Sequence, residues 1–277
     1  MRRHLWLWVA VGLLAGCVRR GPQDAGREPS VTGAVSEAEF KALHVLRTAA
    51  PPAPRGQELE VAGMKAYLSL PPGAKGPLPA VLVIHEWWGL NAHMRHWADR
   101  LAANGYAALA VDLYGGEVAT TGDRALALLR AVDPARATQA LRAAHAFLQE
   151  DPRIRAPRTG SLGWCFGGSW ALRTAMAIPE LDAAVLYYAN PVVTDVEALA
   201  PIRASVLGIF AARDEVIPPE KPRALREALA AAGVRHRIVE FDGLHGFANP
   251  SNEDYVEASA AAAWAETSRF FESHLRP

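Results

Sequence analysis

From residue 80 onward, short apolar runs alternate with longer stretches in which apolar and polar residues recur at helical spacing. The apolar runs are rich in Ala, Val, Ile and Leu, a pattern typical of strands that are buried on both faces and therefore parallel. The expected strands cover Ala80–Ile84, Tyr106–Val111, Thr159–Gly163, Asp182–Tyr188, Ser205–Ala211 and Arg235–Phe241. The expected helices cover Met94–Asn104, Arg124–Val132, Pro134–Gln149, Ser169–Ala177, Lys221–Ala232 and Asn252–His274.

This alternation predicts an α/β fold, with a doubly wound, mostly parallel sheet that carries helices on both faces. The segment Glu58–Leu70 is expected to add an antiparallel hairpin at one edge of the sheet. In such sheets ligands bind beyond the carboxyl ends of the strands. Candidate chemistry is therefore sought directly after each predicted strand.

The first 17 residues follow a different pattern. A basic start, Met-Arg-Arg-His, precedes an apolar run from Leu5 to Gly16, as in a secretory signal. The run is too short for a permanent transmembrane helix, which needs about 20 residues. Its end, Leu14-Ala15-Gly16-Cys17, resembles a bacterial lipobox, in which cleavage precedes the cysteine and the cysteine carries lipid. A plain secretory signal with an incidental Cys17 is the alternative.

The chain is accordingly divided into three parts. Residues 1–16 are predicted to be a lipoprotein signal peptide, residues 17–56 a lipidated N-terminus and linker, and residues 57–277 the folded domain. The linker is polar and ends in Pro51-Pro52-Ala53-Pro54, a composition typical of tethers, although 36–47 could form a short helix. We expect an exported protein whose only membrane contact is the lipid anchor. Val18 after the cysteine favours the periplasmic face of the outer membrane in a two-membrane bacterium.

Composition narrows the function classes. Of 277 residues, 51% are hydrophobic and 21% charged, which permits a large core and excludes disordered and collagen-like classes. There are 29 basic and 29 acidic residues, and removing 1–16 leaves 27 and 29, a net charge of −2. Without a basic surplus, nucleic-acid binding is not expected. Two cysteines cannot form a disulfide scaffold, and if Cys17 is acylated, Cys165 is the one remaining thiol.

Cys165 occupies a glycine-flanked turn between a predicted strand and a predicted helix. The sequence Gly163-Trp164-Cys165-Phe166-Gly167-Gly168 has the spacing of a nucleophile elbow, with cysteine in place of serine. The following helix supplies a partial positive charge at its N-terminus, which favours the thiolate form. The alternative is a small buried structural cysteine in a Gly-rich turn.

Two further strand ends supply partners for this nucleophile. Asp214 follows the strand Ser205–Ala211, and His245 lies in a glycine-flanked loop after the last strand. The chain order nucleophile, acid, base fits this sheet topology. A histidine oriented by a carboxylate would activate the thiol. Asp242 and Glu215 are weaker candidates for the acid and read more simply as solvated loop charges.

The loop after the first central strand reads His85-Glu86-Trp87-Trp88-Gly89. The backbone N–H of Trp87 could join that of Phe166 in an oxyanion hole, where one donor is typically worth about 10²–10³ in rate. Glu86 is unusual here, because a carboxylate repels a neighbouring thiolate. It must be neutralised or act as a proton acceptor for the thiol.

Taken together, these motifs resemble the dienelactone hydrolase family over nearly the whole domain. The motifs are His85–Asn91, Asp112-Leu113-Tyr114, Gly163–Gly168, Asp214-x-x-x-Pro218 and His245-Gly246-Phe247. The resemblance implies an α/β-hydrolase fold and a triad of Cys165, His245 and Asp214. It also implies that Glu86 interacts with the resting thiol and helps to generate thiolate when substrate arrives.

The chain differs from the family in the residues that would bind the carboxylate of the substrate. Family members that act on dienelactone hold this carboxylate with arginines, one of them four residues after the histidine, where this chain has Asn249. The second arginine corresponds to the region of Arg124, and the tyrosine expected after it aligns with Ala127. At least half of the residues that would bind the substrate carboxylate are therefore missing, so dienelactone itself is not the expected substrate. Aromatic residues near the strand ends suggest an apolar pocket, with a place in the core as the alternative for some of them; these are Trp87, Trp88, Trp164 and Tyr188.

The leading hypothesis is a carboxylic ester hydrolase, acting on a small ester or lactone through a cysteine acyl-enzyme. It requires no cofactor and no metal. His93 and His96 lack a third ligand and read as surface residues, and no nucleotide-binding glycine loop is present. Acyl transfer to an acceptor other than water fits the sequence equally well. A catalytically inactive, membrane-anchored binding module on a hydrolase fold is the hypothesis from another class. We expect a monomer.

Overall fold

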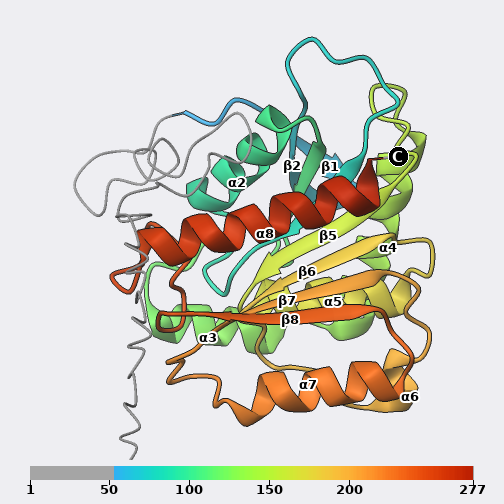
Figure 1. Ribbon diagram of the computed structural model, residues 1–277. Coiled ribbons are helices and arrows are strands. Elements are labelled where there is room, and N and C mark those ends of the chain that lie inside the picture. The colour runs from blue at the N-terminus through green and yellow to red at the C-terminus, as the bar shows by residue number, and fades with distance from the viewer. Residues whose placement is uncertain (1–52, 277) are drawn as a thin grey trace, which may run out of the picture.

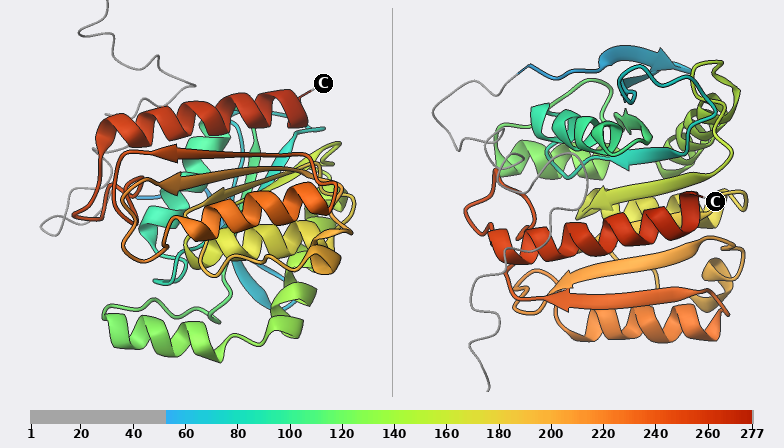
Figure 2. Two further views of the ribbon diagram at one scale, coloured as in Figure 1. Left: turned by 60° about the horizontal axis from the view of Figure 1, so that its bottom comes forward. Right: turned by 45° about the horizontal axis from the view of Figure 1, so that its top comes forward.

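The computed structural model describes residues 53–276, which form one eight-stranded sheet with helices on both faces (Figures 1 and 2). The strands are β1 (Gln57–Val61), β2 (Met64–Ser69), β3 (Ala80–Ile84), β4 (Ala107–Val111), β5 (Thr159–Trp164), β6 (Ala183–Tyr187), β7 (Ser205–Ala211) and β8 (His236–Phe241). The helices are α2 (Ala92–Ala103), α3 (Gly122–Ala131), α4 (Pro134–Glu150), α5 (Phe166–Ala177), α6 (Val196–Leu199), α7 (Glu220–Ala231) and α8 (Glu257–Leu275). The predicted α/β fold class is confirmed.

The sheet has the strand order β1-β2-β4-β3-β5-β6-β7-β8. The β1–β2 hairpin is antiparallel, as predicted from the sequence, and β2 pairs antiparallel with β4. All other pairs are parallel. The chain adds β4 on one side of β3 and then β5 on the other, so the strand order reverses between β3 and β5. Ligands bind in α/β sheets at such a reversal.

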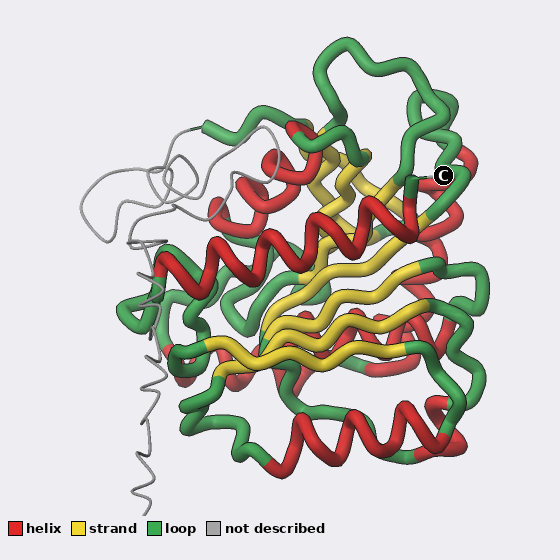
Figure 3. The backbone as a smooth tube through the Cα atoms, viewed as in Figure 1, coloured by secondary structure: helices red, strands yellow, loops and turns green. Residues whose placement is uncertain are grey.

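The central strands are buried because helices cover both faces of the sheet. Helices α2 and α8 lie on one face, and α4, α5 and α7 lie on the other (Figures 1 and 2). Every residue of β3, β4, β6 and β7 is buried, which explains their continuous apolar sequences. The edge strand β8 has no buried residue, and its sequence mixes polar and apolar residues instead. The strands form one continuous, twisted sheet (Figure 3).

Two helical predictions need correction, and one short helix was missed. Helix α5 begins at Phe166 and not at Ser169, because Gly167 and Gly168 enter its first turn, where they pack against neighbouring strands. Helix α8 begins at Glu257 and not at Asn252, because side chains in this segment accept hydrogen bonds from the backbone two residues on and form turns. The short α6, capped by Asp195, was not predicted.

Several predictions concern residues outside 53–276. The signal peptide, the lipidation of Cys17 and the helix over 36–47 lie outside the described residues and stay predictions. Within the part of the chain that the structure describes, no helix combines the length and the apolar character needed to cross a membrane.

Candidate active site

Cys165 lies on a sharp turn between β5 and α5, at the carboxyl end of the sheet. Its backbone has φ +52° and ψ −116°, a conformation that non-glycine residues rarely adopt. Three hydrogen bonds hold it there: the Cys165 N–H donates to Tyr187 O (2.9 Å), and Cys165 O accepts from Ser169 N (3.2 Å) and Asn190 N (3.1 Å). Strain that the surroundings impose in this way is typical of functional sites. The side chain is partly exposed.

Glycines make this turn possible. A Cβ atom on Gly163 would overlap the carbonyl group of Gly167, across the turn. A Cβ atom on Gly167 would lie 2.5 Å from His85 O and closer still to Ile84 O. The helix therefore approaches both its own strand and the end of β3 more closely than any side chain permits. This matches the crowded nucleophile elbow predicted from the sequence.

His245 and Asp214 meet beside this turn. His245 Nδ1 lies 2.9 Å from Asp214 Oδ2. The other carboxylate oxygen, Oδ1, accepts the N–H groups of Val216 and Ile217, both at 2.8 Å. The Asp214 side chain is only 2% exposed, so its charge acts on the imidazole with little screening. Asp214 is thus fixed by backbone donors and directs the ring of His245.

The two weaker candidates for the acid lie elsewhere. Asp242 accepts a hydrogen bond from Arg213 at 2.7 Å, and its side chain is 73% exposed. Glu215 is exposed next to Asp214. Only Asp214, of the three, bonds to His245.

His245 carries a strongly perturbed pKa. Burial lowers the pKa of the ring, but the hydrogen bond and charge of Asp214 and the proximity of Cys165 outweigh burial and raise it to about 10. The second ring nitrogen, Nε2, is buried and makes no hydrogen bond among the described residues. Asp214 therefore holds the imidazole through Nδ1, and Nε2 is the nitrogen left for a further partner.

Glu86 is a buried carboxylate next to the same cluster. Its Oε2 accepts a hydrogen bond from Asn249 Nδ2 (2.8 Å), and the Tyr188 hydroxyl reaches Oε1 at 3.5 Å. Burial raises the pKa of Glu86, while the charge of His245 and the two hydrogen bonds lower it, which leaves it at about 7. Glu86 and His245 thus have perturbed and different pKa values, a pattern common among neighbouring titratable groups at functional sites.

The loop between β3 and α2 is held by His85. Burial lowers the pKa of His85, so the ring is neutral. Its Nε2 accepts the Leu113 N–H at 3.1 Å, which leaves Nδ1–H to donate to Glu86 O at 2.5 Å. The ring packs at 4.5 Å from Tyr114 and at 5.7 Å from Phe166. This arrangement fixes the backbone that precedes Trp87.

The two predicted oxyanion donors, the N–H groups of Trp87 and Phe166, follow Glu86 and Cys165 directly. Within residues 53–276, neither N–H donates to another group. Phe166 opens helix α5, where the first N–H groups have no partner inside the helix and carry the positive end of its dipole. Both donors are therefore available to a ligand.

The predicted substrate contacts divide into two groups. Trp88 is half-buried and packs on Trp87, with ring centroids 4.7 Å apart. Tyr188 is fully buried, and its ring lies 5.1 Å from that of His245. Asn249 is 6% exposed and bonds to Glu86.

Arg124 and Trp164 lie outside this group. Arg124, on α3, forms an exposed ion pair with Glu117, and the structure gives it no contact with Cys165 or His245. Trp164 is 1% exposed and packs against Trp97 and Tyr187, so it belongs to the core and not to a substrate pocket. Of the two interpretations from the sequence, pocket or core, Trp164 fits the core, because it is the last residue of β5 and still packs among buried rings.

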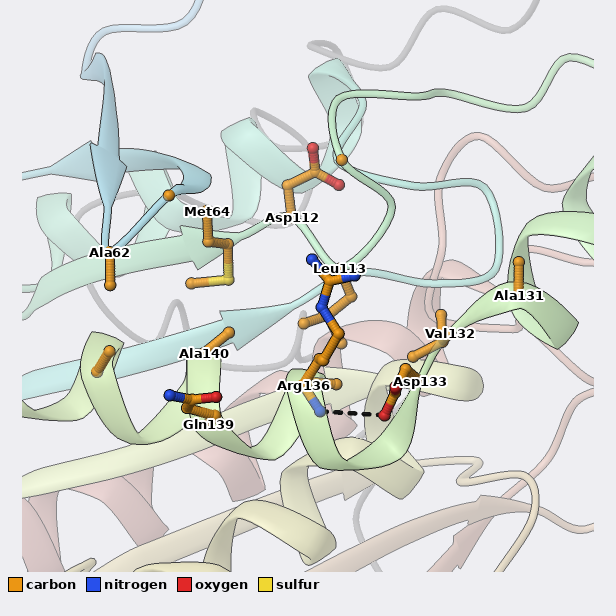
Figure 4. A pocket seen from close by; sticks show the side chains of 14 residues that line it. Ala62, Met64, Asp112, Leu113, Ala131, Val132, Asp133, Arg136, Gln139 and Ala140 are labelled. Atoms are coloured by element: carbon orange, nitrogen blue, oxygen red, sulfur yellow. Dashed lines mark hydrogen bonds between the residues drawn. The ribbon is translucent and has the colours of Figure 1, made fainter.

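A cavity of about 470 Å³ lies beside the carboxyl end of β4 (Figure 4). Its walls come from the β1–β2 turn, the residues after β4, and helices α3 and α4 (Figure 4). Arg136 extends from α4 toward Leu113 within it. None of Cys165, His245, Asp214 and Glu86 lines this cavity, so it is separate from the cluster around Cys165.

Metal binding has no support in the described residues, because no group of three His, Cys, Asp or Glu side chains there could hold an ion. His93 and His96 were expected at the surface, and that was wrong: both are buried on α2. His93 accepts a hydrogen bond from Trp97 Nε1 at 3.2 Å. These histidines face the core, where polar side chains are kept only when they are hydrogen-bonded.

The comparison with known proteins decides the family. The profile of the dienelactone hydrolase family matches residues 64–275. The chain belongs to this family. It is a dienelactone hydrolase-like hydrolase with an α/β-hydrolase fold, as the resemblance of its motifs implied.

Relatives and solved structures agree with this assignment. The "Putative carboxymethylenebutenolidase" of Aquifex aeolicus is 31% identical over 230 residues, which cover 79% of this chain and 98% of the relative. The crystal structure of a "Putative Dienelactone Hydrolase" from Klebsiella pneumoniae has a TM-score of 0.73 at 28% identity, covering 79% of this chain and 99% of that one. A dienelactone hydrolase-like promiscuous phosphotriesterase from metagenomic libraries has a TM-score of 0.74 at 23% identity, covers 79% of this chain and 98% of its own, and supports the fold alone.

Proposed function

We propose that this protein hydrolyses carboxylic esters or lactones through an acyl-enzyme on Cys165, with His245 and Asp214 completing the triad. The observation that carries the proposal is the 2.9 Å contact between His245 Nδ1 and Asp214, which leaves a buried, unpaired Nε2 beside a cysteine on a strained turn. The family supplies the reaction class. The choice of nucleophile, acid and base rests on this geometry.

The two perturbed pKa values support a division of the proton transfers. The hydrogen bond and charge of Asp214, together with the Cys165 thiolate, raise the pKa of His245 to about 10, so His245 is an imidazolium once the thiolate has formed. With a pKa of about 7, Glu86 is partly ionised at neutral pH, where a general base works best. Glu86 therefore accepts the proton of Cys165, and the thiolate forms beside the imidazolium of His245.

Acylation then follows. The thiolate attacks the carbonyl carbon, and the negative charge moves to the carbonyl oxygen, where the N–H groups of Trp87 and Phe166 receive it. As the tetrahedral intermediate collapses, the C–O bond to the leaving group breaks. His245 gives its proton to the departing alkoxide. The product at this stage is an alcohol and a thioester on Cys165.

Deacylation reverses the roles of the same groups. Neutral His245 takes a proton from water while the water attacks the thioester. Collapse of the second intermediate expels the Cys165 thiolate and leaves the carboxylic acid product. Glu86 returns its proton to the sulfur, and His245 is again protonated. Every group ends in its starting state, with one water consumed.

The surroundings of the triad favour esters without a second carboxylate. Asn249 occupies the position where family members that bind dienelactone have an arginine, and its amide is engaged with Glu86. Arg124 is paired with Glu117. The half-buried rings of Trp87 and Trp88 lie beside the oxyanion donors. Neutral acyl groups therefore fit better than anionic lactones.

The test compares wild type with Cys165→Ala on p-nitrophenyl acetate and on dienelactone. We expect wild type to turn over the acetate ester faster than dienelactone, and the variant to lose turnover of both substrates. Equal turnover by the two proteins would remove Cys165 from the mechanism. Faster turnover of dienelactone would overturn the proposed preference for neutral esters.

We further propose that the mature chain is anchored by lipid on Cys17, as its lipobox-like sequence indicates. Labelling of cells with radioactive palmitate tests this. Wild type should be labelled and recovered with membranes, and Cys17→Ser should be unlabelled. Labelling of both proteins would place the lipid elsewhere.

A further inference from the structure

Tyr114 carries a hydroxyl group that the triad does not use. The residue follows β4 in the segment Asp112-Leu113-Tyr114 and is 8% exposed. Its backbone is fixed, because Tyr114 N donates to Asp112 Oδ1 at 2.8 Å. Its hydroxyl oxygen is buried and has no hydrogen-bond partner among the described residues. Buried hydroxyl groups are nearly always paired, so this one requires an explanation.

The ring of Tyr114 packs against both segments that supply the proposed oxyanion donors. It lies 4.5 Å from the ring of His85, two residues before Trp87. It lies 5.6 Å from the ring of Phe166, whose N–H is the other donor. The ring therefore fills the space between the loop after β3 and the start of α5.

The hydroxyl is also within electrostatic reach of the nucleophile. Burial raises the pKa of Tyr114 above its ordinary value, and the negative charge of the Cys165 thiolate raises it further. Tyr114 thus remains protonated throughout the working pH range and can only donate to an anion. It is a neutral donor, close to a site where negative charge develops.

We propose that the Tyr114 hydroxyl is a third oxyanion donor, which joins the N–H groups of Trp87 and Phe166 when the tetrahedral intermediate forms. All three donors lack an acceptor in the described residues of the resting enzyme. The hydroxyl donates a hydrogen bond and transfers no proton. Its proton stays on Tyr114 during acylation and deacylation. This inference rests on the proposed acyl-enzyme reaction.

An unpaired donor in the resting state suits this role. Leaving a buried hydroxyl without a partner destabilises the folded protein. The same hydroxyl gains an acceptor only when the carbonyl oxygen becomes negative, so its stabilisation is realised in the transition state and not in the ground state. Activity and stability should therefore respond in opposite directions when the hydroxyl is removed.

The test is Tyr114→Phe, which keeps the ring packing and removes one oxygen atom. On p-nitrophenyl acetate we expect kcat/KM to fall about a hundredfold, the usual order for one oxyanion donor, with KM nearly unchanged. We also expect Tm to rise by about 2–4 °C, because an unpaired buried hydroxyl is removed. Tyr67→Phe is the matched control. Its hydroxyl is buried and bonded to Asp99 at 2.7 Å, away from the site, so Tm should fall while kcat/KM stays the same.

Alkylation of Cys165 by iodoacetamide separates an oxyanion role from an effect on the thiolate. This reaction uses the thiolate but creates no oxyanion, so Tyr114→Phe should react at the wild-type rate. A parallel loss of alkylation and ester turnover would overturn the inference and assign Tyr114 to the thiolate. Unchanged kcat/KM would also overturn it. If wild type is alkylated but shows no Cys165-dependent ester turnover, the proposed function itself fails, and the inference falls with it.

Discussion

Asn249 Nδ2 donates a 2.8 Å hydrogen bond to Glu86 Oε2, which joins two residues that lie 163 positions apart in the chain. Both residues are 6% exposed, so the bond is protected from water. In family members that act on dienelactone, an arginine at the position of Asn249 would face a substrate carboxylate. Here the side chain stabilises a carboxylate of the protein itself. The contact therefore engages the amide of Asn249 and lowers the pKa of Glu86.

Asn249→Leu should shift the pH dependence of the reaction. The hydrogen bond lowers the pKa of Glu86, so its loss should raise that pKa above about 7. In the proposed mechanism ionised Glu86 accepts the thiol proton, so the acid limb of kcat/KM should move to higher pH. Rates on p-nitrophenyl acetate at pH 6 and pH 9 measure this. The variant should lose more activity at pH 6, and an equal loss at both values would contradict the role of Glu86.

Glu86→Gln should make stability less sensitive to pH. The folded-state pKa of about 7 exceeds the ordinary 4.5, so folding favours the protonated carboxyl group. Its stabilising contribution is present below about pH 4.5 and is lost as the pH rises through 7. Relative to the variant, wild type should lose about 2 kcal/mol of unfolding free energy between pH 5 and pH 8. Urea unfolding at both values tests this, and a constant difference would show that burial does not raise the pKa of Glu86.

Asp214→Asn should disable the imidazole without unfolding the protein. The hydrogen bond and the charge of Asp214 both raise the pKa of His245, so this pKa should fall from about 10. The amide group can donate a hydrogen bond to Nδ1, which favours the wrong tautomer of the ring. We therefore expect kcat to fall by about 10³-fold or more. Titration of the His245 ring by NMR and steady-state kinetics provide the two readouts. Glu215→Gln, at the exposed neighbouring position, is the control and should keep wild-type activity.

Gly167→Ala should destabilise the turn that presents Cys165. The new methyl group would lie 2.5 Å from His85 O and closer to Ile84 O, so backbone segments must separate. We expect a loss of about 1–3 kcal/mol in unfolding free energy, together with lower activity. Gly122→Ala is the matched control, because the nearest atom to its new methyl group is 3.6 Å away on Trp87. That variant should change stability by less than about 0.5 kcal/mol. Equal effects of the two substitutions would show that the close packing at Gly167 is unimportant.

The strands could be predicted from the sequence, and so could the positions of Cys165, Asp214 and His245 after strand ends, because both depend on local patterns. Buried parallel strands are continuous apolar runs, and the turn around Cys165 needs glycines at fixed positions. The bounds of α5 and α8 were harder to predict. They depend on close packing of Gly167 against β3 and on turns formed by Asn249 and Asn252.

Contacts between segments that lie far apart in the chain could not be predicted from the sequence. Nothing local indicates that Asn249 bonds to Glu86, or that His93 is buried beside Trp97. His85 stood in a motif, but its role in holding the loop after β3 comes from the Leu113 N–H, 28 residues away. The unpaired hydroxyl of Tyr114 likewise depends on the packing of three segments. In the sequence, Tyr114 was noted only as part of the motif Asp112-Leu113-Tyr114, to which no role was assigned.

The central claim, a covalent acyl-enzyme on Cys165, is tested most directly by mass spectrometry of protein quenched during turnover of p-nitrophenyl acetate. His245→Ala should slow deacylation, because no group then activates water. Acylation should continue, because p-nitrophenolate is a stable anion that departs without the proton of His245, so the acyl-enzyme should accumulate. The account predicts a mass increase of one acetyl group, located by proteolysis on the peptide that contains Cys165 and absent from Cys165→Ala. Ester turnover without any acetylated Cys165, or acetylation at another residue, would contradict it.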